Sequence, residues 1–266
     1  MDALPGDGNA MAVTGAVTGA VTAAAMPPSK LLWAAEVPRA AWMAATWWRH
    51  RAALAAAPRG DGRPVLLLPG LFNSDRSNAM MRRYLTRLGY RAEGWGLGRN
   101  IGAKTVGANG EALIARVAAL ADVAGPVTLI GVSLGGIMAR LVAHERPDLV
   151  REVITVSSPF AGSGRATNVW RAFEWITGER LDDPAVLARS ARIAGALPVP
   201  ATAIWSRSDG LVAGSICHDA ACHAVEVRSG HLGVQMQPAV LLAIADVLGH
   251  DDIGLSEPAM ANRATP

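Results

Sequence analysis

The chain has 266 residues, of which 51% are hydrophobic and 18% are charged. This length fits one α/β domain of ordinary size, and the composition allows a large buried core, which excludes disorder for most of the chain. The formal net charge is +3, and the basic residues are scattered along the sequence without forming a run. The sequence therefore predicts no nucleic-acid partner.

Residues 1–29 contain a stretch rich in Ala, Val, Thr and Gly. They lack the positively charged start and the leucine-like core of a secretory signal, and their apolar run falls short of a membrane span. We interpret them as a disordered, low-complexity leader and expect a cytoplasmic protein. Residues 251–266 at the other end are expected to form a flexible tail.

Residues 30–62 have the spacing of an N-terminal helical segment, which we expect Pro38 to interrupt. Residues 47–51 in this segment read Trp-Trp-Arg-His-Arg. Aromatic rings next to positive charge are typical of a helix that lies on a membrane surface. A helix packed on the domain or on a second subunit fits the same pattern, so peripheral membrane contact and the oligomeric state are both left open.

Six short runs within residues 63–250 have the apolar or alternating character of β-strands, and they cover 65–68, 90–95, 127–130, 153–156, 201–205 and 224–227. Helices are expected between and after them at 77–88, 110–124, 137–144 and 238–248. Gly89 is expected to end the first of these helices, and Asn109 to cap the second. Strands that alternate with helices imply an α/β fold with a mostly parallel central sheet and helices on both faces.

The longest interval without a predicted strand covers residues 157–200. It carries Trp170, Phe173, Trp175 and Ile176 at helical spacing, which indicates a small helical cap inserted over one end of the sheet. These side chains are expected to form the core of the cap, to line an entrance for substrate, or both. We take Trp170 and Phe173 as candidate pocket residues.

Residues 131–135 read Gly-Val-Ser-Leu-Gly and lie between a predicted strand and a predicted helix. This is the structural context that the Gly-x-Ser-x-Gly pattern needs in order to mark a catalytic serine. Ser133 on such a sharp turn takes a strained backbone conformation, and Gly131 and Gly135 remove side chains that would crowd it. The pattern predicts a reactive hydroxyl at the carboxyl end of the sheet, beside the positive N-terminus of the following helix.

This motif, the segment 66–71 (Leu-Leu-Leu-Pro-Gly-Leu) and the order Ser, Asp, His along the chain resemble the α/β-hydrolase superfamily. Within that superfamily, segments 69–72 and 94–102 look most like bacterial lipases and esterases. The resemblance spans about residues 63–248, and its motifs are specific for the fold and the catalytic class but not for the substrate. It implies a serine hydrolase that cleaves carboxylic esters of small molecules or lipids.

A serine hydroxyl is a weak nucleophile at neutral pH, so it needs a base and an acid that orients the base. His231 follows the last predicted strand and Asp209 follows the fifth, where the resemblance places these two residues. The other histidines are less well placed, and they are His50, His144, His218, His223 and His250. Among the acids, Asp219 lies past its strand, and Asp182 and Asp183 lie in the expected cap.

The resemblance also implies an oxyanion hole of two backbone N–H groups. One belongs to Leu134, directly after Ser133, and the other to Leu71, after the Pro-Gly pair that follows the first strand. Leu71 and Phe72 are expected to present an apolar wall to the acyl group. In the expected reaction Ser133 attacks the ester carbonyl and His231 removes its proton. Water then releases the acyl-enzyme, without a metal or an organic cofactor.

Two alternatives to ester hydrolysis fit the same sequence features. An acyltransferase or thioesterase would use the same triad on another donor or acceptor. A catalytically silent member of the fold would serve as a binding module instead.

The two cysteines of the chain, Cys217 and Cys222, form a cluster with His218 and His223. Zinc sites usually pair ligands at short spacing and repeat the pair elsewhere, and this cluster does not match such a pattern. A local disulfide and two free thiols are the interpretations that remain.

Overall fold

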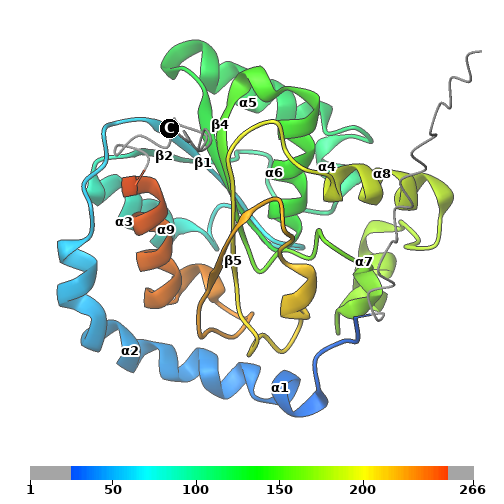
Figure 1. The fold of residues 1–266 in the computed structure, drawn as a ribbon, viewed down its shortest axis with the longest axis horizontal. Helices are drawn as coiled ribbons and strands as arrows, with labels where there is room; N and C mark the ends of the chain where they lie inside the picture. Colours follow the sequence, from blue (N-terminus) through cyan, green and yellow to red (C-terminus); the bar gives the residue numbers. More distant parts are fainter. Residues whose placement is uncertain (1–24, 251–266) are drawn as a thin grey trace, which may run out of the picture.

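The computed structural model describes residues 25–250, apart from the side chains of 41–45 and 250. The expected leader up to residue 24, the expected tail, and the side chains of Trp42 and His250 lie outside this described part. A sheet with helices on both sides forms the centre of the molecule (Figure 1).

The central sheet contains six parallel strands in the order β2-β1-β3-β4-β5-β6. They are β1 (Pro64–Leu68), β2 (Arg91–Gly94), β3 (Val127–Val132), β4 (Val150–Val156), β5 (Ala201–Trp205) and β6 (His223–Glu226). Each overlaps one predicted run, which confirms the parallel α/β arrangement. The chain reverses its winding direction between β1 and β3, and ligands of such sheets bind beside the carboxyl ends of the strands at this point.

The two faces of the sheet pack against different helices, because alternate side chains of a strand point to opposite faces. The helices are α3 (Ala79–Leu88), α5 (Glu111–Ala124), α6 (Leu134–Glu145) and α9 (Pro238–His250). In β1, Val65 and Leu67 share a core with α3 and α9, whereas Leu66 and Leu68 share the other core with α5 and α6. All four side chains are fully buried, so β1 holds the two layers of helices together.

The predicted cap at Asn109 is wrong. The residue that precedes α5 is Gly110, whose φ of 79° is left-handed. Asn109 instead donates its backbone N–H and its side-chain amide to the carboxylate of Glu111, at 3.2 and 3.0 Å. The glycine conformation takes Asn109 out of the capping position, and an acidic residue in the first turn supplies the favourable charge there.

The N-terminal segment consists of α1 (Lys30–Ala34) and α2 (Glu36–Ala56), which are separated at Ala35. The predicted interruption at Pro38 is therefore wrong. Pro38 sits in the first turn of α2, where a missing N–H removes no hydrogen bond of the helix. α2 lies beside α9 along one side of the molecule (Figure 1), and the buried side chain of Leu54 joins it to the core there.

The tryptophans of this segment have different surroundings. The indole N–H of Trp47 donates to Met236 O at 2.8 Å, and its ring packs against the core. Trp33 and Trp48 are more than half exposed, and the guanidinium of Arg51 lies 4.5 Å from the ring centroid of Trp48. Packing on the domain thus accounts for Trp47, whereas membrane contact through the exposed rings stays a prediction. Among the described helices, none combines the length and the apolarity that crossing a bilayer requires.

The interval 157–200 contains α7 (Trp170–Thr177) and α8 (Pro184–Ala194). Trp170 and Phe173 line the cavity that is described below, whereas Trp175 is 86% exposed. A helix turns by roughly 200° over two residues, so Trp175 lies on the face opposite Phe173. The expectation that these aromatic side chains act together is therefore wrong for Trp175.

Gly89 ends α3 as predicted, with a left-handed φ of 110°. A Cβ there would lie 3.0 Å from Gly60 O, whereas a Cβ at Gly62, with φ of 86°, would meet nothing within 4 Å. Both changes to alanine strain the backbone, but only Gly89→Ala adds a steric contact. We expect Gly89→Ala to lower the free energy of unfolding by about 1–2 kcal/mol, and by more than Gly62→Ala, in urea denaturation. Equal losses would contradict the steric contribution of Gly60 O.

Candidate active site

Ser133 lies directly after β3 and directly before α6. Its backbone has φ of 51° and ψ of −119°, outside the regions that residues with a Cβ favour. Its N–H donates to Val156 O of β4 at 2.8 Å, and its own carbonyl oxygen accepts the N–H of Gly136 at 3.0 Å. A strained residue that is held on both sides is typical of a functional site.

The turn between β3 and α6 closes only because three positions carry no side chain. A Cβ at Gly131 would overlap the backbone of Gly135, and a Cβ at Gly135 would overlap Leu68 O. A Cβ at Gly136 would overlap Ser158 Oγ. Side chains at these positions would force α6 away from the ends of β1 and β3.

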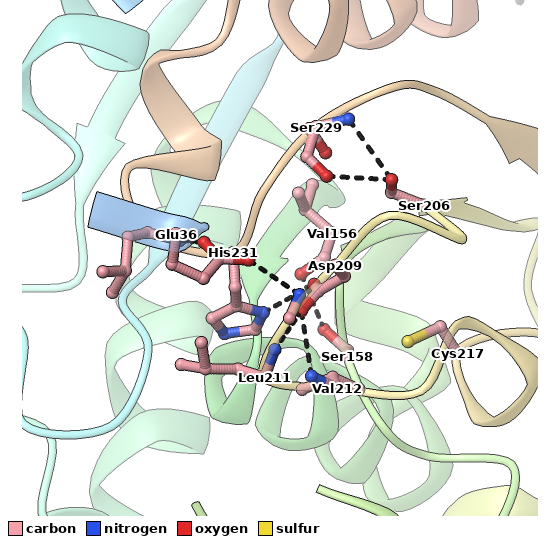
Figure 2. A network of polar contacts seen from close by, with 12 residues as sticks. Glu36, Val156, Ser158, Ser206, Asp209, Leu211, Val212, Cys217, Ser229 and His231 are labelled. Carbon is pink, nitrogen blue, oxygen red and sulfur yellow. Dashed lines mark hydrogen bonds and ion pairs between the residues drawn. The ribbon is translucent and has the colours of Figure 1, made fainter. Parts of the chain in front are cut away.

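Asp209 and His231 lie side by side, in the loops that follow β5 and β6 (Figure 2). His231 Nδ1 and Asp209 Oδ2 are 2.7 Å apart. The second carboxylate oxygen, Oδ1, accepts the backbone N–H groups of Leu211 at 2.8 Å and Val212 at 2.9 Å. One oxygen of this buried carboxylate thus fixes its own loop, and the other is left for the imidazole.

Charge and burial act in opposite directions on this pair. Burial raises the pKa of the Asp209 carboxyl, but the charge and hydrogen bond of His231 and the N–H groups of Val212 and Leu211 outweigh it, so the pKa is lowered. Burial lowers the pKa of His231, but the charge and hydrogen bond of Asp209, with the charge of Glu36, raise it above its ordinary value. The pair therefore keeps Asp209 ionised and makes the imidazole a better proton acceptor.

Two serines that sequence reasoning missed tie these loops together (Figure 2). Ser206 Oγ donates to Ser229 O at 2.9 Å and accepts the Ser229 N–H at 3.2 Å. Ser206 comes shortly before Asp209, and Ser229 comes shortly before His231. Their place in the two loops was the only signal, and it does not distinguish them from ordinary turn serines.

The structure brings Asp209 and His231 together, but among the described residues no hydrogen bond joins the Ser133 hydroxyl to the imidazole. All three residues lie at the carboxyl edge of the sheet, Ser133 after β3, Asp209 after β5 and His231 after β6. Catalytic hydrogen bonds are often long without substrate and shorten in the complex. The contact between Ser133 and His231 therefore stays a prediction.

The loop after β1 passes beside the serine. A Cβ at Gly70 would lie 3.4 Å from Ser133 Cβ, so the backbone that carries Leu71 is a direct neighbour of the turn. Within the described part of the chain, the N–H groups of Leu71 and Leu134 make no hydrogen bond. Two unpaired donors beside a serine are suited to hold a developing negative charge, and their alignment on a substrate oxygen stays a prediction.

Asn100, which sequence reasoning missed, holds this loop. The residue is fully buried. Its Nδ2 donates to Pro69 O at 2.7 Å, and its backbone oxygen accepts the N–H of Phe72 at 2.7 Å. Its Oδ1 accepts the N–H of Gly102 at 3.1 Å. Its place in the segment 94–102, which contributes to the family resemblance, was the only signal available in the sequence.

A cavity of about 160 Å³ includes Ser133 in its wall. Leu71 and Leu134 line it beside the serine, and the candidate pocket residues Trp170 and Phe173 line it from α7. Further apolar side chains complete the wall, among them Val106, Ile137, Leu141, Phe160, Val186 and Ile193. The space next to the serine is therefore suited to an apolar group.

Phe72 does not belong to the residues that line this cavity, so its expected place in the pocket is wrong. Its ring is half exposed, and the guanidinium of Arg99 lies 4.6 Å from the ring centroid. The backbone at Phe72 has φ of 62° and is tied to Asn100. This tight turn leaves the ring at the surface, and Leu71 is the neighbour that lines the cavity.

Within the described residues, neither cysteine makes a hydrogen bond to Ser133, Asp209 or His231. Cys217 and Cys222 are not bonded to each other, and each sulfur lies near a backbone oxygen. Burial raises the pKa of the Cys217 thiol well above its usual value, which disfavours the reactive thiolate. His218 stacks on Trp205, with ring centroids 4.4 Å apart. The described residues contain no group of three or more His, Cys, Asp or Glu side chains that could hold a metal ion.

No protein-family model matches this sequence, and no curated protein matches it. Solved structures do match. A metagenome-derived lipolytic enzyme, one of the pair LipS and LipT, aligns with a TM-score of 0.54 at 14% identity, over 73% of this chain and 96% of the other. A pyrethroid hydrolase, PytH, aligns with a TM-score of 0.52 at 17% identity, over 72% of this chain and 99% of the other.

The chain has the α/β-hydrolase fold. Identities this low establish the fold alone, because one fold carries many activities. The chemistry of this α/β-hydrolase-fold protein depends on the residues at the carboxyl edge of its sheet.

We expect Asn100→Ala to disturb the loop beside Ser133 more than it disturbs the rest of the fold. The change leaves Pro69 O without its donor and the Gly102 N–H without its acceptor. Two unsatisfied buried groups cost about 1–3 kcal/mol each in the free energy of unfolding. Urea denaturation measures this loss, and hydrogen exchange of the Phe72 and Asn73 amides, which are both hydrogen-bonded in this loop, locates it. Unchanged protection of both amides would contradict the anchoring role.

Proposed function

We propose that this protein is a serine hydrolase that cleaves carboxylic esters, with Ser133 as nucleophile, His231 as base and Asp209 as the acid that orients the base. The proposal rests on two features that occur together. The strained turn at Ser133 and the 2.7 Å contact between His231 and Asp209 lie at the same edge of the sheet. The N–H groups of Leu71 and Leu134 beside the serine supply the donors that acyl transfer requires.

In the first half of the reaction Ser133 Oγ attacks the ester carbonyl carbon, and His231 Nε2 takes the hydroxyl proton. Asp209 holds the proton on Nδ1 and stabilises the imidazolium that forms. The negative charge on the former carbonyl oxygen is held by the N–H groups of Leu71 and Leu134. When the intermediate collapses, the bond between the acyl carbon and the alcohol oxygen breaks. His231 gives its proton to this alcohol oxygen, and the alcohol leaves.

The second half repeats the same chemistry with water. His231 removes a proton from water, the resulting hydroxide attacks the acyl carbon, and Ser133 leaves with the proton from the imidazolium. Every proton moves through one imidazole, so the reaction needs only the three side chains and the two backbone donors.

The cavity favours an apolar acyl group as the part of the substrate that binds beside Ser133. Aliphatic and aromatic side chains form most of its wall, with Trp170 and Phe173 on the side of α7. The two charged side chains in the wall, Arg189 and Glu179, are paired with each other. Such a surface gains free energy by removing hydrocarbon from water and offers little to a charged acid. We therefore propose esters with an apolar acyl part, from small molecules or lipids, as the substrate class.

We expect Ser133→Ala to lower the hydrolysis of p-nitrophenyl esters by about 10⁴-fold or more, because no other group in the site replaces the nucleophile. Esters of graded acyl length measure the activity and its preference. A fluorophosphonate probe, followed by mass spectrometry of the labelled peptide, measures the reactivity of the serine directly.

Ser215→Ala is the matched control, since Ser215 is an exposed serine that does not line the cavity. It should keep both the activity and the labelling. Retention of ester hydrolysis by Ser133→Ala, or labelling of a different serine, would contradict the assignment of the nucleophile. A folded wild-type protein that neither hydrolyses esters nor reacts with the probe would contradict the proposed hydrolase function.

The pH dependence should report the raised pKa of His231. The base acts only when its imidazole is neutral, and the pKa of His231 is raised above its ordinary value of about 6.5. We therefore expect kcat/KM to rise with pH and to reach half of its plateau above about pH 6.5. Initial rates from about pH 5 to about pH 9 measure this midpoint. A midpoint below the ordinary histidine value would contradict the dominance of the Asp209 charge over burial.

A further inference from the structure

Glu36 is a buried acidic residue that the proposed reaction does not use. It is the first residue of α2 and is only 2% exposed. Its Oε1 accepts the backbone N–H of Gly210 at 2.7 Å, and its Oε2 accepts the backbone N–H of Leu232 at 2.8 Å. Gly210 directly follows Asp209, and Leu232 directly follows His231. One carboxylate thus joins the loop of the acid to the loop of the base (Figure 2).

Glycines in both loops make this close approach possible. A Cβ at Gly210 would lie 2.9 Å from Glu36 Oε1 and would overlap Leu32 O. A Cβ at Gly230 would lie 2.7 Å from Glu36 Oε2. The two glycines therefore leave room for the carboxylate that α2 brings against the loops.

The base needs support of this kind because its loop follows a weak element. β6 has four residues, lies at the edge of the sheet and pairs with β5 alone, and its side chains are mostly exposed. A short edge strand fixes the chain that follows it less firmly than a central strand does. The Ser206–Ser229 contacts hold the start of the loop, and Glu36 holds it just after the imidazole.

Two further side chains of α2 bind the chain next to these loops. The guanidinium of Arg39 donates to Ser208 O at 2.6 Å, directly before Asp209. The indole of Trp47 donates to Met236 O at 2.8 Å, beyond His231. α2 therefore crosses both loops, and Glu36 is the one side chain of this set that contacts both.

The charge of Glu36 supports the His231 base, as its hydrogen bonds to the two loops do. The charges that act on the His231 imidazole are Asp209 from the loop after β5 and Glu36 from α2, and both raise its pKa against the effect of burial. Arg39, the nearby cation of α2, is directed to Ser208 O. A second negative charge therefore favours the imidazolium that forms when the base takes the serine proton.

We propose that Glu36 is a positioning residue that holds the loops of Asp209 and His231 in register, so that the acid–base pair stays assembled at the sheet edge. This role rests on the hydrolase function proposed above. It makes α2, a helix far from the catalytic residues in sequence, a working part of the site.

Glu36→Gln tests the role with little change in size. The amide keeps one acceptor oxygen but sets an NH₂ group against the second backbone N–H, so one of the two loop contacts is lost. We expect kcat for a p-nitrophenyl ester to fall by about 10-fold or more, with KM within about 2-fold of wild type. The acid limb of the pH profile should move to lower pH, because the charge that raises the pKa of His231 is removed.

Leu54→Ala is the matched control. It removes a buried side chain by which the same helix packs on the core, but Leu54 has no part in the two loops. Both variants are compared below their unfolding temperatures. Leu54→Ala should lower the Tm and keep kcat and the pH profile, whereas Glu36→Gln should change both.

NMR titration of the His231 ring gives a readout that does not require turnover, with the resonance assigned by comparison with His231→Asn. In Glu36→Gln the pKa of His231 should fall, and the downfield Nδ1–H signal shared with Asp209 should weaken. The proposal is overturned if Glu36→Gln leaves the titration and kcat at wild-type values, or if Leu54→Ala changes them equally. A wild-type protein without ester turnover or probe labelling refutes the hydrolase function, and the titration still decides the role of Glu36.

Discussion

The close approach of α6 to the ends of β1 and β3 is the constraint on which the rest of the site depends. Glycine at 131, 135 and 136 permits this approach, and Ser133 between them is forced to a φ of 51°. The position of the serine is therefore set by backbone sterics and not by packing of its own side chain. The same approach brings the loop after β1 against the serine, so it also decides where the unpaired N–H groups and the apolar cavity lie.

The acid and base are held by a different kind of interaction. They stand on loops, and hydrogen bonds from distant parts of the chain fix those loops. Asp209 binds two backbone N–H groups of its own loop, Ser206 joins this loop to the next one, and Glu36 reaches both from α2. Local backbone sterics thus fix the turn of Ser133, whereas tertiary contacts fix the loops of Asp209 and His231. Electrostatic preorganisation requires the turn and both loops to keep their positions.

The sequence predicted the central strands well because β1, β3 and β4 are short, largely apolar runs that are buried in a parallel sheet. It predicted helix ends less well. Pro38 lies inside the first turn of α2 and Asn109 lies just outside the cap of α5, and such shifts of one to three residues do not change the apolar spacing. Phe72 shows a third kind of error, because an aromatic residue next to a predicted site need not face it.

By itself the sequence determined the fold class and the candidates for nucleophile, acid and base. Local sterics mark the serine and the order of strands gives the fold class, whereas the resemblance to the α/β-hydrolase superfamily placed the acid and the base. The tertiary structure alone decided which loops meet, that Asn100 anchors the loop of Leu71, and that Glu36 joins the loops of Asp209 and His231. A buried carboxylate that binds backbone N–H groups leaves no pattern in the sequence, because its partners are main-chain atoms of residues far away in the chain.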